Sequence, residues 1–130
     1  MQDKEILTQF EAATLNPFGH REHILVAWLY LRRDGRDTGY QHIQAGLKHF
    51  ALAHGADSKY HETITRFWSL LVQHCIERHP DISDFEQFLA TFPIVLDQNA
   101  MLKHYSRDVL FSDVARQSWQ APDLIAMPTR

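Results

Sequence analysis

The sequence has 130 residues and a formal net charge of −3 when its histidines are neutral. Hydrophobic residues make up 45% and charged residues 22%, which is typical of a globular protein and argues against disorder. The chain has no basic stripe, so nucleic-acid binding has little support. The longest apolar run, 24–31, is far too short to span a membrane, and MQDKEILTQF lacks the features of a signal peptide. These properties predict one cytoplasmic domain over residues 1–130.

Cysteine and histidine usage limits the chemistry further. Cys75 is the only cysteine, so no intrachain disulfide can form. Its place in an apolar stripe predicts a small buried hydrophobe rather than a reactive thiol. The chain also has nine histidines, which can titrate between about pH 5 and 7 or bind metal ions.

The apolar spacing predicts helices almost throughout the chain. Asp3 can cap the first helix, and Thr38 with Gln41, like Ser83 with Glu86, fits a capping box at a helix start. Gly55 suits the end of the third helix. The helices expected from these signals cover residues 3–14, 20–33, 37–54, 59–79 and 83–92.

The helix expected over 59–79 has the longest regular pattern. Apolar residues recur at steps of three and four along it, which is the spacing of a buried helix face. Asp57 or Ser58 can cap its start, and Pro80 stops it. This helix is expected to be the centre of the core.

The pattern is weaker after Pro93. A sixth helix over 94–105 would turn Leu96, Tyr105 and either Met101 or Ala100 inward, and Ser112 can cap a short helix to about Gln117. Residues 119–130 read as an extended tail, laid across the body by Trp119, Leu124 and Ile125. The fold class predicted is therefore all-α, a single-domain compact bundle of five to six helices with an extended C-terminal tail.

His20 and His23 form the first candidate site. They are three residues apart at the start of the second helix, so their side chains share one face. Two neutral imidazoles in this arrangement can bind one metal ion. The spacing is a weak signal by itself, because it arises easily in a chain with many histidines.

His61 and Glu62 form the second candidate site, in the first turn of the long helix. If the two helix starts lie together, His61 completes a three-histidine set, and three protein ligands with an open position are typical of a catalytic metal. Glu62 could be a fourth ligand or a general base acting on bound water. Tyr60 and Arg107 would line the pocket.

Each of these residues also has a plainer interpretation. His61 could hydrogen-bond a backbone carbonyl, and Glu62 could pair with Arg66 on the helix surface. Arg107 could bind an anionic ligand group as a fork, but an ion pair with Asp108 or Asp113 is favoured over that.

Three motifs, FGHREHILVAWLYL, KYHETIT and YSRDVLFS, carry a resemblance that spans about residues 17–124. Through them the chain resembles a group of small bacterial proteins of about this length that have no assigned activity. The resemblance implies a free-standing bacterial domain and no particular reaction. A weaker analogy of design is to the DinB-like helical bundles, which bind one metal with three histidines from different helices.

Two hypotheses about function follow. The first is a mononuclear metalloenzyme acting on a small molecule, with a divalent transition metal (zinc, iron, copper or nickel) bound by His20, His23 and His61. The second is a non-enzymatic helical module that binds a small ligand or a protein, with structural histidines. A homodimer whose helices complete the bundle is compatible with either hypothesis.

Overall fold

The computed structural model describes residues 2–127, and this part of the chain contains α-helices and short 3₁₀-helices but no strand. The predicted all-α fold is confirmed. The backbone divides into two compact units, residues 1–60 and 61–130, and each is described by itself. That the two units form a single domain stays a prediction.

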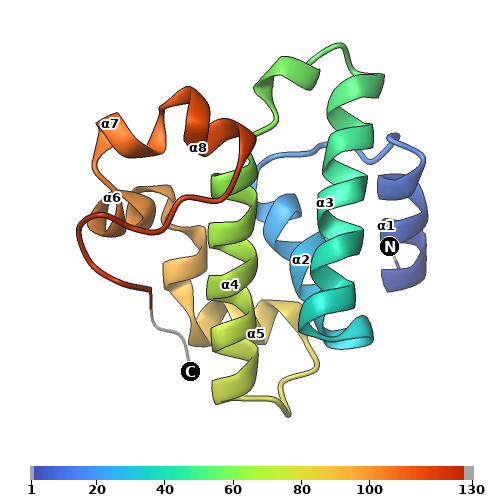
Figure 1. The fold of residues 1–130 in the computed structure, drawn as a ribbon. Helices are drawn as coiled ribbons and strands as arrows, with labels where there is room; N and C mark the ends of the chain where they lie inside the picture. Colours follow the sequence, from blue (N-terminus) through green and yellow to red (C-terminus); the bar gives the residue numbers. More distant parts are fainter. Residues whose placement is uncertain (1, 128–130) are drawn as a thin grey trace. The chain divides into compact units, whose positions relative to one another are not determined.

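The first unit consists of three long helices and one short turn (Figure 1). They are α1 (Asp3–Glu11), α2 (His20–Asp34), α3 (Arg36–Ala53) and the 3₁₀-helix η1 (Asp57–Lys59). Seven α2 residues are buried, as its apolar sequence predicts. The predicted capping box at Thr38 is wrong, because α3 begins at Arg36, directly after Gly35 with its φ of 85°. Gly55, with a φ of 68°, follows the end of α3 as predicted.

Two glycines of α3 let the helices of this unit pack closely. A Cβ on Gly39 would lie 2.9 Å from the Tyr30 carbonyl oxygen, so α2 and α3 approach with their backbones nearly in contact. A Cβ on Gly46 would lie 2.3 Å from Cε2 of Phe10, a fully buried residue of α1. Close packing in the core of this unit therefore requires glycine, which has no side chain, at both positions.

The second unit is built around one long helix. Its elements are α4 (Glu62–Arg78), α5 (Phe85–Thr91), η2 (Pro93–Leu96), η3 (Gln98–Ala100), α6 (Met101–His104), α7 (Arg107–Leu110) and α8 (Asp113–Gln117). Helix α4 packs against α8 and η2, and it buries Phe67, Leu71, Val72 and Cys75, as its apolar stripe predicts.

Some predicted helix limits are wrong. The long helix begins at Glu62 rather than Lys59, because His61 caps it while Asp57–Lys59 forms a separate 3₁₀ turn. At α5 the cap is Asp84, whose carboxylate accepts a hydrogen bond of 3.0 Å from the Gln87 N–H, and not Ser83. The cap predicted at Ser112 is confirmed.

The single helix predicted over 94–105 is also wrong. The chain there forms η2, η3 and α6, with an extended backbone at Asp97 between the first two. The Asp97 carboxylate accepts the Asn99 N–H at 3.0 Å, and this local bond competes with a continuous helix. Ala100 and Tyr105 are buried as predicted, but Leu96 is 41% exposed.

The C-terminal segment is extended from Ser118 onward, as predicted, although residues 128–130 of the predicted tail lie outside the described residues. Leu124 and Ile125 do not anchor it, because they are 57% and 60% exposed. Trp119 does contact the second unit, with its ring centroid 6.4 Å from that of Tyr105, and polar bonds add to this contact. The His104 carbonyl accepts the Leu124 N–H at 2.9 Å, and the Tyr105 hydroxyl donates to the Gln120 carbonyl at 2.6 Å.

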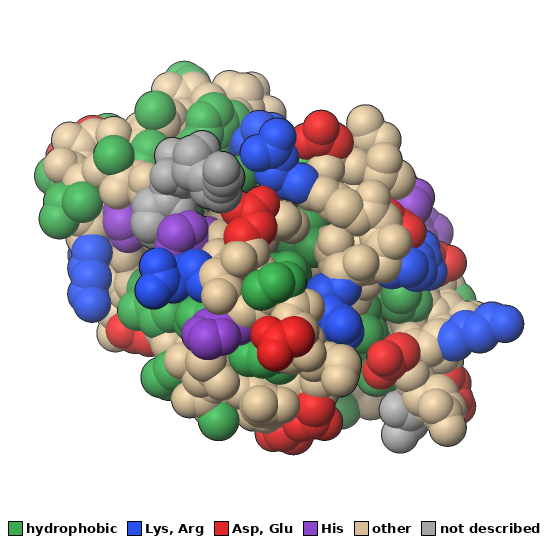
Figure 2. Space-filling model, turned by 90° about the horizontal axis from the view of Figure 1, so that it is seen from below, with side chains coloured by type: hydrophobic (Ala, Val, Ile, Leu, Met, Phe, Trp, Pro, Cys, Tyr) green, Lys and Arg blue, Asp and Glu red, His purple; other side chains and the backbone are tan. Residues whose placement is uncertain are grey.

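None of the helices in residues 2–127 combines the length and apolar character that crossing a membrane requires. On the surface drawn in Figure 2, basic and acidic side chains are interspersed with hydrophobic ones. This mixture agrees with the nearly balanced charge of the composition.

Candidate functional site

The predicted site residues are divided between the two units. His20, His23 and Tyr60 belong to residues 1–60, while His61, Glu62 and Arg107 belong to residues 61–130. Within residues 2–127, no three or more His, Cys, Asp and Glu side chains are grouped so as to hold a metal ion. The three-histidine metal site stays a prediction.

His20 and His23 lie in the first turn of α2, as predicted. The turn is closed by the Gly19 N–H, which donates to the Glu22 carboxylate at 2.8 Å. Atoms crowding the His23 ring remove water from it and, with repulsion from His20, lower the pKa of His23 to about 4. A neutral His23 at pH 7 can offer a nitrogen lone pair.

An aromatic row packs against His23. The Phe18 ring centroid lies 4.4 Å from that of His23 and 4.3 Å from that of Phe50. The Phe50 ring in turn stacks on His54 at 4.5 Å, and His54 Nε2 lies 2.9 Å from the Ala13 carbonyl oxygen. This row fixes the loop before α2, and it gives His23 a packing role whether or not it binds a metal.

Tyr60 follows η1 at the end of the first unit. The Lys48 ammonium lies 5.4 Å from the centroid of its ring, a cation–π distance. A role for Tyr60 in lining a pocket stays a prediction.

Both ring nitrogens of His61 form hydrogen bonds within the second unit. Nδ1 accepts the Ile64 N–H at 3.1 Å, which makes His61 the N-cap of α4 rather than a residue of its first turn. Nε2 lies 2.7 Å from the Leu110 carbonyl oxygen, which can only accept, so Nε2 carries the proton. The interpretation that His61 bonds a backbone carbonyl therefore describes this conformation. To bind a metal, His61 would have to give up one of these bonds.

Protonation of His61 conflicts with its cap, since an Nδ1–H would face the Ile64 N–H. Burial lowers the pKa of His61, the bond to Leu110 opposes that shift, and the Arg116 charge adds to it. The pKa in the folded state is thus below the ordinary value of about 6.5, and the unfolded chain binds the proton first. Protonation of His61 at low pH therefore favours the unfolded state of the chain.

We expect the chain to lose stability as the pH falls below about 6.5, through the lowered pKa values of His61 and His23. His61→Asn keeps a cap acceptor but cannot take up this proton, so part of the loss should disappear in the variant. Urea unfolding of both proteins at several pH values between 7.5 and 5 measures the difference. If the free energy of unfolding changed equally with pH in the two proteins, protonation of His61 would not be a cause of the loss.

Glu62 and Arg107 lie in different settings. Glu62 is the first residue of α4 and is only 9% exposed. Arg107 is exposed and opens α7, after the Ser106 hydroxyl accepts the Val109 N–H at 3.2 Å as a cap. Neither the catalytic role of Glu62 nor an anion site at Arg107 follows from these positions, and both stay predictions.

Other residues of the KYHETIT and YSRDVLFS motifs hold the C-terminal segment. The fully buried Thr63 hydroxyl donates to the Ser118 carbonyl at 2.9 Å and accepts the Gln120 N–H at 3.1 Å. The Ser106 N–H donates to the Asp123 carboxylate at 2.8 Å, and hydrogen bonds from Ser106 lower the pKa of Asp123. These motif residues therefore have a structural role that the sequence alone does not reveal.

The second unit also contains a cavity of about 490 Å³ that the sequence did not indicate. Most of its lining is apolar. The residues are Leu71, His74, Cys75, Arg78, Phe92, Ile94, His104, Ile125 and Ala126. Burial raises the pKa of the Cys75 thiol to about 11, so the cavity contains no reactive thiolate at neutral pH. It has the composition of a small-molecule site, an apolar cleft with a few polar groups.

Three side chains supply the polarity of this cavity. The His74 Nδ1 atom is buried and has no hydrogen-bond partner among the described residues. His104 Nδ1 lies 2.8 Å from the Ile125 carbonyl, so it donates there, and in a neutral ring Nε2 remains an acceptor. Arg78 ends α4 with an exposed guanidinium group. The sequence analysis did not place His74 or His104 in a site, because only the fold brings α4, η2 and the C-terminal segment together.

Comparison of the chain with protein-family models, curated proteins and solved structures found no match in any of the three.

Proposed function

We propose that the chain is a cytoplasmic helical protein that binds a small molecule in the cavity of its second unit. The observation that carries this proposal is the unpartnered, buried His74 Nδ1 beside an apolar cavity. A buried polar atom without a partner costs free energy in a folded protein, so such atoms mark places where a ligand or water completes the bonding.

The lining indicates the chemistry of the ligand. Phe92, Ile94 and Ile125 offer apolar contact, and Arg78 offers a positive charge that no ion pair in residues 2–127 neutralises. An apolar molecule with one anionic group satisfies both features, because the guanidinium can bind an anion while the apolar body leaves water. This is the second of the two hypotheses that the sequence allowed, a non-enzymatic binding module.

We expect saturable binding of anilinonaphthalene sulfonate, an apolar dye with one anionic group. Ile94→Asp should weaken binding by about tenfold or more, since the new carboxylate would face the apolar body and repel the anion. Arg78→Gln should weaken binding of the sulfonate but leave the uncharged anilinonaphthalene unaffected. Dye fluorescence titrations of the wild-type chain and of both variants measure these dissociation constants.

Leu96→Asp is the matched control for Ile94→Asp. Both residues belong to η2, but Leu96 is 41% exposed and does not line the cavity, so its variant should bind the dye normally. Equal weakening by both variants, or unchanged binding in Ile94→Asp, would rule out this cavity as the site.

Metal binding is the second candidate function, and the His20–His23 pair favours it. The two imidazoles share the first turn of α2, and His23 stays neutral at pH 7 because its pKa is lowered. Zinc, iron, copper and nickel all suit imidazole ligands. His61 can join this pair only by exchanging its cap or carbonyl bond for the metal.

Elemental analysis of tag-free protein purified without chelator tests this candidate. If the pair binds a transition metal, about one equivalent should be found, and His20→Ala and His23→Ala should each lose it. His49→Ala is the control, since His49 is an exposed histidine of α3. No metal after reconstitution with several divalent ions would exclude the metalloenzyme hypothesis and leave the dye-binding prediction intact.

A further inference from the structure

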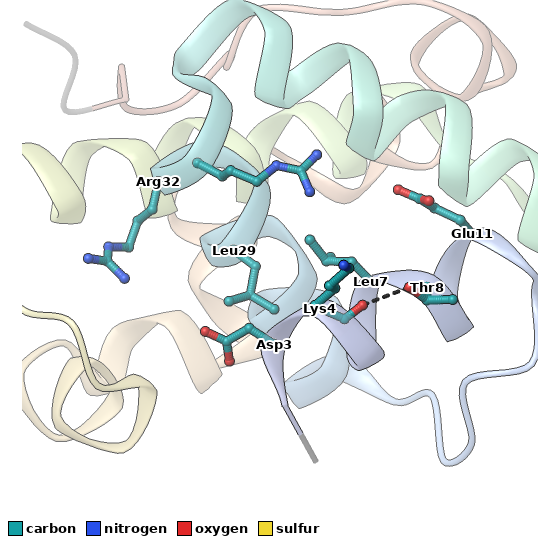
Figure 3. A pocket seen from close by; sticks show the side chains of 8 residues that line it. Asp3, Lys4, Leu7, Thr8, Glu11, Leu29 and Arg32 are labelled. Carbon is teal, nitrogen blue, oxygen red and sulfur yellow. Dashed lines mark hydrogen bonds between the residues drawn. The ribbon is translucent and has the colours of Figure 1, made fainter.

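The first unit has a cleft of its own, of about 660 Å³, between α1 and α2. Its floor is formed by Leu7 and Leu29, which are 5% and 6% exposed. Figure 3 shows these leucines in the middle, Glu11 at one end, and Arg32 with Asp3 at the other. The cleft thus has an apolar floor with a carboxylate at one end and a guanidinium at the other.

The Glu11 end is fixed by a buried tyrosine. The Tyr30 hydroxyl donates a hydrogen bond to Glu11 Oε2, and Tyr30 is only 1% exposed. Burial and this bond raise the pKa of Tyr30, so the phenol keeps its proton and Glu11 remains the acceptor. The other carboxylate oxygen, Oε1, is left to accept a hydrogen bond from a cation.

The Arg32 end is fixed by a buried tryptophan. The Arg32 guanidinium carbon lies 4.7 Å from the centroid of the Trp28 ring, and Trp28 is 2% exposed. This cation–π contact holds the side chain without using its N–H donors, so a carboxylate can still bind them in pairs. The guanidinium group of the neighbouring Arg33 already binds a carboxylate, because it donates hydrogen bonds of 2.8 and 2.9 Å to Asp34.

We propose that this cleft binds a small zwitterion with an ammonium group, an apolar middle and a carboxylate. The ammonium group would lie at Glu11, the apolar part over Leu7 and Leu29, and the carboxylate at Arg32. A free amino acid with its charges far apart, or a short peptide whose C-terminal residue is lysine, has this chemistry. This site is separate from the cavity of the second unit and does not depend on it.

Two other charged residues that line the cleft, Lys4 and Asp3, also affect the affinity for the zwitterion. Lys4 lines the middle of the cleft, where its charge attracts the carboxylate and repels the ammonium group, while Asp3, at the Arg32 end, repels the carboxylate. Thr8 contributes no free donor, because its hydroxyl bonds the Lys4 carbonyl at 2.8 Å, the dashed line in Figure 3. Asp3→Asn should therefore tighten binding of the zwitterion.

Calorimetric titration of the full chain with 6-aminohexanoate, hexanoate and hexylamine tests the proposal. The zwitterion should bind at least about tenfold more tightly than either single-charge analogue, because only it meets both ends. Arg32→Met should bind 6-aminohexanoate no better than wild type binds hexylamine. Glu11→Gln, which keeps an oxygen for the Tyr30 hydroxyl, should bind it no better than wild type binds hexanoate.

Glu5→Gln is the control, since Glu5 is an exposed acid of α1 that does not line the cleft, and its variant should bind like wild type. Equal affinity for the zwitterion and either analogue would overturn the proposal. So would the absence of saturable binding of 6-aminohexanoate up to about 10 mM, or an equal loss in Glu5→Gln and Glu11→Gln.

Discussion

Gly46→Ala is expected to lower the free energy of unfolding by about 2 kcal/mol, although alanine is the better helix former. The new Cβ would lie 2.3 Å from Phe10 Cε2, so the ring has to move. Phe10 is fully buried, and its ring lies 5.6 Å from that of Phe18 and 6.0 Å from that of Phe50, so it has no free space to enter. Overpacking of this kind costs about 3 kcal/mol at its upper end, which exceeds the gain of about 1 in helix propensity.

Urea unfolding of the wild type, of Gly46→Ala and Phe10→Ala, and of the double variant makes this test decisive. In a Phe10→Ala background the clash is absent, so Gly46→Ala should become stabilising, by up to about 1 kcal/mol. Gly19→Ala is the single-site control, because its Cβ would meet Glu22 at an ordinary 3.5 Å. The same loss of stability in both backgrounds would show that the Phe10 contact is not the cause.

The local sequence predicted the long helices well, because burial of an apolar face is a local pattern repeated over many residues. Helix α2, with apolar residues on nearly every side, is buried as expected. The sequence predicted the helix starts less well. At α4 the cap is His61, a residue outside the usual capping set, while the more typical Asp57 and Ser58 form a separate turn.

The helix predicted over 94–105 is wrong for a related reason. Its apolar spacing permits a helix over 94–105, but the local bond of Asp97 and the packing of η2 on α4 break it into short pieces. Such tertiary contacts override a weak helical preference and cannot be seen in the sequence.

The candidate sites also differ in whether the local sequence can predict them. The His20–His23 pair could be found from its spacing, since both residues belong to one helix turn. The cavity of the second unit could not, because its lining comes from α4, η2, α6 and the C-terminal segment. The role predicted for the motif KYHETIT in a metal site stays a prediction, and its clearest role in the structure is at Thr63, which was not among the predicted ligands and bases.

Thr63→Val is expected to lower the free energy of unfolding by about 2 kcal/mol, with almost no change in side-chain shape. The fully buried hydroxyl bonds the Ser118 carbonyl and the Gln120 N–H, and valine leaves both groups without this partner. The segment that follows carries Ile125, which lines the cavity. Thr63→Val should therefore also weaken dye binding, even under conditions where the chain remains folded.

Thr65→Val separates this effect from the loss of any helix hydroxyl. Thr65 donates to the His61 carbonyl at 2.8 Å, but that carbonyl also accepts the Thr65 N–H at 3.0 Å, so no group is left unpaired. Its variant should change stability by less than about 0.5 kcal/mol and bind the dye normally. Equal effects of the two variants would mean that the hydroxyl of Thr63 does not hold the C-terminal segment. A large effect of Thr63→Val alone, on both stability and dye binding, would connect the start of α4 with the wall of the cavity.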